Sequence, residues 1–437
     1  MTLAARRNIT LEDALRDAEA RYVEANPQSR ARHAQACDSL PGGNTRSILF
    51  YPPFPVTITR GQGARLWDVD GHAYTDFLGE YTAGLYGHSH PVIHAAVRQA
   101  LDGGIVLGAP NRSEAELARL MCARFPSLDM VRFCNSGTEA NLNALSGARA
   151  ATGRSHVMVF EGAYHGGMLS FAHGTSPMNI PFPYVFGRYN DLDRTLGLIE
   201  RHQDELAAIV IEPMMGAGGC IAAEPEFLAG LRAAASRHGI VLIFDEVMTS
   251  RLGPGGLQAK LGILPDMTTF GKYLGGGMSF GAFGGRAGIM SRFDPSLPDA
   301  LPHSGTYNNN VLTMAAGVAG LSKVFTPEAA DTLSATGERL KVRLNRIGER
   351  RDVPVQTTGV GSILCMHFQR QPIHQPDDTE HTPAAARALF HLEMLARGFY
   401  VARRGFIALS LPLTASDYDA FAAAFDDFLG ACGAALA

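Results

Sequence analysis

Lysine is scarce in this chain of 437 residues, because only four of its 38 lysine and arginine residues are lysines. The six cysteines have no paired spacing, which indicates neither a disulfide framework nor a zinc site. No apolar run reaches the length of a transmembrane helix, and the net charge of −4 offers no basic surface to nucleic acid or anionic lipid. The composition therefore argues against membrane, nucleic-acid-binding and disulfide-rich proteins.

Apolar residues, in contrast, make up 46% of the chain, enough to bury a large core. The N-terminal stretch, with Arg6, Arg7 and the segment 11–15, is typical of a charge-mixed amphipathic helix. It lacks the apolar segment of a signal peptide. We therefore expect a cytoplasmic protein.

The order of sequence patterns predicts an α/β protein. A Pro/Gly-rich passage at 41–55 follows the N-terminal helix and cannot be a continuous helix or a central strand. Strand-like runs then alternate with helical stretches such as 226–238, which predicts a parallel sheet covered by helices. Near the C-terminus, two helical stretches enclose a β-rich middle at 355–368 and 400–411. We expect a small α+β domain built from both ends of the chain and a large domain between them, with the boundaries 1–70, 71–325 and 326–437.

Lys272 differs from the other lysines in its surroundings. It follows a strand-like apolar run at 267–270 and precedes the glycines of 275–277, where a flat ligand can approach closely. A partly desolvated lysine has a lowered pKa and becomes a nucleophilic amine, which suits Schiff-base chemistry. A compositional preference for arginine explains the scarcity of lysine but not this location.

Two carboxylates, Asp245 and Glu246, end the apolar run 241–244, which is typical of a parallel strand buried on both faces. A buried acid needs a partner. The ring nitrogen of pyridoxal phosphate supplies one, because a carboxylate keeps this nitrogen protonated and lets the ring act as an electron sink. Alternate strand residues point to opposite faces, so only one of the acids can address the ring. We assign this role to Asp245 and a structural role to Glu246.

A phosphate site is predicted where the strand-like run 130–134 turns into a helix through Ser136, Gly137 and Thr138. Hydroxyls and free N–H groups at a helix N-terminus bind phosphate, although the same sequence also serves as an ordinary helix cap. Ligands of open α/β sheets bind outside the carboxyl ends of the strands. Five predicted strands end beside groups that suit one pyridoxal phosphate site at that edge, namely Ser136, Tyr164–His165, Glu212, Asp245 and Lys272.

The segments 135–140, 164–166, 245–248 and 271–277 resemble class III aminotransferases of fold type I, the group that includes glutamate-1-semialdehyde aminomutase. The resemblance covers nearly the whole chain. Within the class, four stretches are most similar to the aromatic β-amino acid (β-phenylalanine) aminotransferases, and these are 43–47, 80–84, 304–310 and 404–406.

This resemblance implies a seven-stranded, mostly parallel sheet in the large domain and bound pyridoxal 5'-phosphate. Lys272 and Asp245 are the implied catalytic residues. The resemblance also implies a homodimer with its active sites at the subunit interface, where Thr306 of the partner subunit reaches the phosphate. The implied cofactor-binding residues are Ser136, Gly137, Thr138, Tyr164, Glu212, Asp245, Val247, Met248, Lys272 and Thr306.

The substrate pocket is predicted from arginines, because a guanidinium binds a carboxylate bidentately. The resemblance implies that Arg46 binds a β-amino acid, that Arg404 binds the 2-oxo acid acceptor, and that Tyr81 belongs to the same pocket. The expected reaction is transamination of an aromatic β-amino acid with 2-oxoglutarate or pyruvate, giving a 3-oxo acid. The role of Arg251 is open.

Several alternatives share the predicted cofactor residues. These are a glutamate-1-semialdehyde-type 2,1-aminomutase, another ω-amino acid or amine aminotransferase, a decarboxylase or racemase, and a catalytically inactive binding protein. A nicotinamide enzyme is disfavoured, since the glycines at 216–219 do not form the dinucleotide fingerprint. His88 and His90 lack a third ligand, so no metal site is predicted.

Overall fold

The computed structural model describes residues 10–437. Arg6 and Arg7 lie outside these residues, and the predicted N-terminal helix is described from Leu11 onward as α1 (Leu11–Ala25). The Thr10 side chain caps α1 by accepting a hydrogen bond from the Asp13 N–H. A second helix that the sequence did not separate, α2 (Pro27–Cys37), begins directly after Asn26 because proline suits the first helical position.

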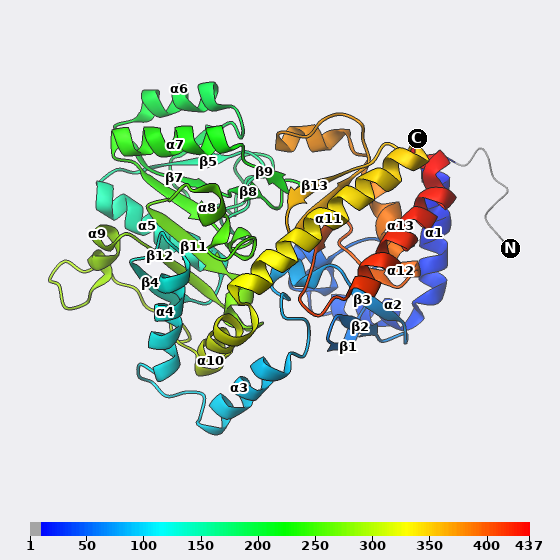
Figure 1. The fold of residues 1–437 in the computed structure, drawn as a ribbon, viewed down its shortest axis with the longest axis horizontal. Coiled ribbons are helices and arrows are strands. Elements are labelled where there is room, and N and C mark those ends of the chain that lie inside the picture. Colours follow the sequence, from blue (N-terminus) through cyan, green and yellow to red (C-terminus); the bar gives the residue numbers. More distant parts are fainter. Residues whose placement is uncertain (1–9) are drawn as a thin grey trace.

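A seven-stranded sheet forms the centre of the fold (Figure 1), in the order β4-β12-β11-β10-β7-β5-β6. Neighbouring strands from β11 to β6 pair in parallel, whereas β12 is antiparallel to both β11 and β4. The predicted, mostly parallel seven-stranded sheet is therefore confirmed. Its strands are β4 (Met130–Cys134), β5 (His156–Phe160), β6 (Tyr184–Gly187), β7 (Leu206–Ile211), β10 (Val241–Asp245), β11 (Met267–Gly271) and β12 (Gly281–Gly285).

Every residue of β7, β10, β11 and β12 is buried, as the apolar run 241–244 predicts for β10. Helix α5 packs against β7, β10, β11 and β12, while α7 packs against β10 and α6 against α7. The predicted helix at 226–238 is confirmed as α7, and Gly239 ends it in the left-handed conformation. The helices of this region are α3 (Pro91–Asp102), α4 (Arg112–Arg124), α5 (Gly137–Thr152), α6 (Leu192–His202), α7 (Pro225–His238), α8 (Gly256–Leu261), α9 (Ala287–Met290) and α10 (Val311–Ala319).

Segments from both ends of the chain share the four-stranded sheet β1-β2-β3-β15. Strand β15, from the C-terminal part, pairs in parallel with β3, so the N- and C-terminal parts form one unit. The hairpin of β2 and β3 crosses residue 70, and the division of the chain at residues 70 and 325 stays a prediction. The strands are β1 (Ile58–Gln62), β2 (Arg65–Asp68), β3 (Ala73–Asp76) and β15 (Phe399–Tyr400).

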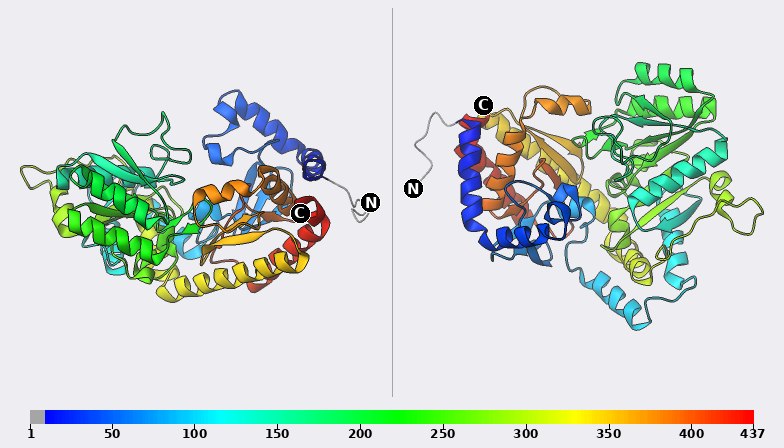
Figure 2. Two further views of the ribbon diagram at one scale, coloured as in Figure 1. Left: turned by 90° about the horizontal axis from the view of Figure 1, so that it is seen from above. Right: turned by 180° about the vertical axis from the view of Figure 1, so that it is seen from behind.

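The C-terminal part contains three helices and a second small sheet, β13-β14-β16. The sequence predicted two helical stretches and missed α12, which lies between the two β-rich segments. Helices α1, α12 and α13 pack together, and α11 extends from this group toward the large sheet (Figures 1 and 2). These elements are α11 (Pro327–Arg351), β13 (Gln356–Val360), β14 (Ile363–His367), α12 (Ala384–Ala396), β16 (Phe406–Ala408) and α13 (Ala415–Leu436).

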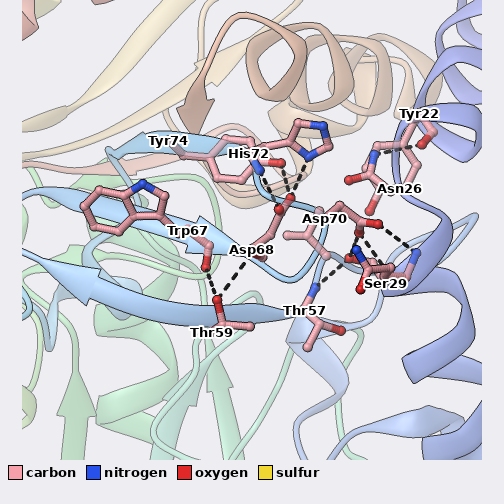
Figure 3. Close-up of polar contacts among 12 residues, drawn as sticks. Tyr22, Asn26, Ser29, Thr57, Thr59, Trp67, Asp68, Asp70, His72 and Tyr74 are labelled. Carbon is pink, nitrogen blue, oxygen red and sulfur yellow. Dashed lines mark hydrogen bonds and ion pairs between the residues drawn. The ribbon is translucent and has the colours of Figure 1, made fainter.

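Asp70, in the turn between β2 and β3, fixes the start of α2 (Figure 3). Its carboxylate accepts hydrogen bonds from the N–H groups of Gln28 (2.7 Å) and Ser29 (2.9 Å) and from the Ser29 hydroxyl (2.6 Å). The Ser29 hydroxyl in turn accepts from the Thr57 N–H at 3.2 Å. Because Asn26 makes no capping bond with its side chain, Asp70 supplies the cap from a distant segment.

All six cysteines are free, and three of them are buried. Across residues 10–437, no helix is both long enough and apolar enough to cross a lipid bilayer.

Candidate active site

Five parallel strands deliver the predicted cofactor groups to one edge of the sheet. Strands β4, β5 and β7 end at Cys134, Phe160 and Ile211, as predicted, while β10 ends at Asp245 and β11 at Gly271. The chain therefore continues from this edge directly into the residues that the sequence singled out.

Asp245 is buried and held by three donors. Its Oδ2 accepts a hydrogen bond from the Asn141 amide at 2.8 Å and lies 2.8 Å from Nδ1 of His165, while its Oδ1 accepts from the Val247 N–H at 3.0 Å. Asn141 is fixed in turn, because its Oδ1 accepts from the Thr269 hydroxyl at 2.8 Å. The acid is thus locked in orientation by α5, β11 and the 163–165 segment.

A carboxylate has about four acceptor positions, so these three donors leave one position on Oδ1 for a further N–H group. A protonated pyridine nitrogen fits this requirement. The sequence placed His165 at the strand end without a role, and it missed Asn141 and Thr269. The available signal for Asn141 was its position on the helix, one turn after Gly137 and on the same face.

Lys272 begins the turn after β11 and has a positive φ of 56°. Burial lowers the pKa of its amine to about 8, although the Asp245 and Glu212 carboxylates oppose this shift. The charges of Arg404 and Arg46 add to the lowering. A substantial fraction of the amine is therefore neutral, and nucleophilic, near neutral pH.

Glu212 joins two turns at the sheet edge. Its Oε1 accepts from the Tyr164 N–H at 3.0 Å, and its Oε2 accepts from the Gly216 N–H at 2.9 Å. Burial and the nearby Asp245 carboxylate raise the pKa of Glu212, against the lowering effect of His165 and the two N–H donors. The Tyr164 side chain itself is 47% exposed, which leaves its ring available to a ligand.

The start of α5 has the features of an anion site. The first N–H groups of a helix lack partners within the helix. Of these groups in α5, the Ser136 hydroxyl accepts a hydrogen bond only from the Glu139 N–H, at 3.2 Å. The N–H groups of Gly137 and Thr138 therefore suit a phosphate. A Cβ at Gly137 would lie 3.0 Å from a Val247 methyl group, so a side chain here would crowd the space between the helix and Val247.

Tyr81 lies within contact distance of both predicted substrate arginines. The guanidinium carbon of Arg46 lies 5.8 Å from the Tyr81 ring centre, and that of Arg404 lies 5.2 Å from it. Arg46 forms an ion pair with Glu80. Within residues 10–437 no carboxylate pairs with Arg404, and its buried Nε has no hydrogen-bond acceptor. A ligand carboxylate suits this unsatisfied donor.

The turn that carries Tyr81, a 3₁₀ turn at Gly79–Thr82, has an unusual backbone. Glu80, Tyr81 and Thr82 have φ values of 46°, 52° and 82°, in the left-handed region that residues with a side chain rarely adopt. Each such residue costs on the order of 1–3 kcal/mol and persists only where the surrounding structure enforces it. The pocket is therefore built on a conformation that the turn does not favour by itself.

The remaining predicted residues make no contact with the groups that would hold the cofactor ring nitrogen or phosphate in this chain, although Met248 adjoins the Glu212 turn. Met248 packs beside Gly216, and Thr306 is exposed in the segment before α10. Glu246 is structural, as predicted, because it accepts hydrogen bonds from the Thr249 hydroxyl and from the N–H groups of Leu257 and Gln258 at the start of α8. His88 pairs with Asp76 at 2.9 Å.

A lysine amine with a lowered pKa, an oriented buried carboxylate and an anion site at one sheet edge match the three ends of pyridoxal phosphate. Fold and site together define a pyridoxal-phosphate-dependent transferase of fold type I. When bound, the cofactor supplies the electron sink that makes the substrate's C–H bond acidic. The position of Lys272 would suit a base and acid that moves this proton, and the free acceptor position on Asp245 would suit the protonated ring nitrogen.

Comparison with known proteins agrees with this definition. The family model for class III aminotransferases matches residues 50–428. The chain is 51% identical over 98% of its length to a β-phenylalanine transaminase of Variovorax paradoxus, of which it covers 98%. A solved structure of a β-phenylalanine aminotransferase from that organism superimposes with a TM-score of 0.96, covering 97% of this chain and 99% of the other. A glutamate-1-semialdehyde 2,1-aminomutase of Heliobacterium modesticaldum is 36% identical over 92% of this chain and 96% of its own.

The chain belongs to the class III aminotransferases, and it is a pyridoxal-phosphate-dependent transaminase with small-molecule substrates. The resemblance seen in the sequence is thereby confirmed for the fold, the cofactor and the class of enzyme. The roles of individual residues stay predictions that rest on the geometry given above.

Proposed function

We propose that this transaminase takes an aromatic β-amino acid as amino donor and a 2-oxo acid, such as 2-oxoglutarate or pyruvate, as acceptor. The donor becomes a 3-oxo acid. The observation that carries the proposal is the guanidinium of Arg404, which stands beside Tyr81 without a carboxylate partner among residues 10–437 and influences the pKa of Lys272. The named β-phenylalanine transaminase relative supports the choice of donor.

Two arginines suit two substrates of different length. A β-amino acid places its carboxylate one carbon further from the reacting nitrogen than an α-amino acid does, so a single fixed guanidinium cannot bind both equally well. Arg46 and Arg404 flank the same tyrosine from different segments of the chain. We assign Arg46 to the β-amino acid and Arg404 to the 2-oxo acid, with Tyr81 between them.

The test separates the two half-reactions. Purified enzyme is mixed with α-amino acids, β-amino acids and simple amines, and conversion of the cofactor is followed by its absorbance. A charge-assisted hydrogen bond contributes roughly 1.5–3 kcal/mol, so Arg46→Ala is expected to slow the half-reaction with a β-amino acid by about ten- to more than a hundredfold. Arg404→Ala is expected to slow the half-reaction with 2-oxoglutarate by a similar factor.

Arg403→Ala is the matched control, because this neighbouring arginine donates to the Pro52 carbonyl at 2.6 Å. It should leave both half-reactions within about twofold of the wild type, as surface substitutions generally have small effects. Equal losses in both half-reactions for Arg46→Ala and Arg404→Ala would contradict the assignment. Turnover without any 2-oxo acid would indicate an aminomutase instead.

We further propose a homodimer in which Thr306 of the partner subunit reaches the cofactor phosphate. Thr306 is exposed, and the Asn309 amide that follows it donates to the Ala109 carbonyl at 3.2 Å. The adjoining loop carries exposed apolar side chains at Ile105 and Val106, the latter 80% exposed. Exposed apolar residues of this kind support a protein contact on the same surface as Thr306.

Mixed dimers test this arrangement. Thr306→Ala should weaken cofactor binding, and Lys272→Ala should abolish turnover. If the two residues of one site come from different chains, a hybrid of the two variants has one site with both intact residues. Activity should then reappear on subunit exchange, and its absence in proven hybrid dimers would refute the shared site.

A further inference from the structure

Arg251 is the largest fully buried side chain of the described residues, with 1% of its surface exposed. It lies in the 3₁₀ turn Thr249–Arg251, six residues after Asp245. Burial lowers the pKa of its guanidinium to about 10, yet the group stays charged at neutral pH. A buried charge needs strong compensation.

The compensation comes from neutral groups on three other segments. The Arg251 guanidinium donates to the Thr82 carbonyl at 3.3 Å, to the Ser362 hydroxyl at 3.2 Å and to the Leu409 carbonyl. No carboxylate pairs with it within residues 10–437. A guanidinium with its donors in a fixed fork suits such a bridge, since its geometry holds several acceptors at once.

Two of the three bridged segments carry or adjoin residues of the proposed substrate pocket. Thr82 ends the left-handed turn that presents Glu80 and Tyr81, and Leu409 directly follows β16, which Arg404 precedes. The Leu409 N–H also donates to the Ser362 carbonyl at 2.9 Å, so these two segments are already paired. Main-chain hydrogen bonds already join the chain on either side of the turn to this pair, from the Ala408 N–H to the Phe77 carbonyl at 2.7 Å and from the Leu411 N–H to the Leu85 carbonyl at 2.8 Å. Arg251 adds a restraint at the last residue of the turn itself.

We infer that Arg251 is a positioning residue that holds the left-handed Gly79–Thr82 turn against the C-terminal strands and thereby sets where Tyr81 stands between Arg46 and Arg404. The strained backbone of the turn needs an external restraint, and Arg251 donates to the carbonyl of its last residue. The inference rests on the proposed function for its effect on substrate binding. The restraint of the turn is independent of which substrate is used.

The test compares Arg251→Lys with Arg154→Lys in the holoenzyme. A lysine keeps the charge but cannot reach three separate acceptors. Arg154 is a matched control, because its guanidinium likewise donates to three neutral acceptors, the carbonyls of Leu206, His238 and Gly239, near the amino ends of the sheet strands. Two quantities are measured, namely hydrogen exchange of the peptide 77–86 and the dissociation constant of 3-phenylpropanoate, a carboxylate without an amine.

Arg251→Lys should speed exchange in 77–86, where the N–H groups of Tyr81, Ala83 and Gly84 are hydrogen-bonded within the turn. It should also weaken 3-phenylpropanoate binding and raise KM for the amino donor by about fivefold or more, while kcat and cofactor retention stay within about twofold. Arg154→Lys should change none of these. If Arg251→Lys does not fold, Ser362→Ala removes one acceptor and should shift the same quantities in the same direction by less.

Unchanged exchange in 77–86 overturns the inference, and so does a parallel loss of kcat and cofactor with no selective loss of carboxylate binding. Faster exchange in 77–86 and weaker 3-phenylpropanoate binding in Arg154→Lys would overturn it as well. A wild-type enzyme that rejects β-amino acids refutes the proposed function instead. The exchange and 3-phenylpropanoate measurements still decide the role of Arg251 in that case.

Discussion

Replacing Asp245 with asparagine tests the electronic role of the acid with little change of shape. The carboxylate accepts from Asn141, from the Val247 N–H and from a third group, His165, each within 3.0 Å. An asparagine has one acceptor oxygen and one NH₂ group, so at least one of these donors must face another donor. The ring nitrogen of the cofactor also loses its anionic partner.

The magnitude follows from these contacts. Losing a hydrogen bond to a charged group costs roughly 1.5–3 kcal/mol, which corresponds to a ten- to more than hundredfold slower amino-donor half-reaction. A buried donor left without an acceptor costs a further 1–3 kcal/mol or so in stability. The half-reaction is followed by stopped-flow absorbance of the bound cofactor, and stability by denaturant unfolding.

Glu246→Gln is the matched control, since it makes the same acid-to-amide change at the next residue. Glu246 is also buried, but its partners are Thr249, Leu257 and Gln258 at the start of α8. This variant should lose stability by about 1–3 kcal/mol and keep its half-reaction rate per folded molecule. Equal slowing by both substitutions would refute the reasoning, because the rate would then depend on packing and not on the ring nitrogen.

Further predictions concern the protonation of Lys272 and the contribution of Asp70 to stability. In cofactor-free enzyme, modification of Lys272 by an aldehyde should be half-maximal near pH 8 and not near 10.5, as read by mass spectrometry with Lys272→Ala as control. Because this folded-state pKa is depressed, the stability of the cofactor-free protein should rise with pH between about 8 and 10.5, where only the unfolded chain still binds the proton. Asp70→Ala should lower the free energy of unfolding by about 1–2 kcal/mol without changing turnover, since three hydrogen bonds at the start of α2 are lost. Its hydrogen bonds with Ser29 and Gln28 lower the pKa of Asp70 despite its partial burial, so this contribution should fade as the pH falls through that lowered value.

The cofactor edge was predictable because strand ends are visible in the sequence. Apolar runs that stop at Asp245 or just before Lys272 place those groups at one sheet edge once the strands are parallel. The partners of Asp245 were harder to predict, since Asn141 and Thr269 become neighbours only when α5 packs on β11. A polar residue inside a helix gives no indication of which distant acid it will contact.

The substrate side depended still more on tertiary structure. Gly79 is a usual marker of the left-handed conformation, but nothing in the sequence indicates that Glu80, Tyr81 and Thr82 continue it. Arg251 could not be distinguished from a surface arginine in the sequence. Its acceptors are main-chain carbonyls and a serine, and any sequence supplies such groups. Helix α12 was missed between two β-rich segments, of which β14 and β16 pair with each other across it and β15 pairs with the distant β3.

The pairing of β15 with β3 has a consequence for the order in which the enzyme is made. The seven strands of the large sheet and the groups at its cofactor edge lie within residues 130–285, so they leave the ribosome before Arg404, which Tyr81 contacts, and before Phe399 and Tyr400, which pair with β3. An unfinished chain can therefore form the sheet that ends in Lys272 well before it can form the pocket that selects an acid. For that interval, Lys272 stands at the sheet edge without the residues that restrict which molecules reach it.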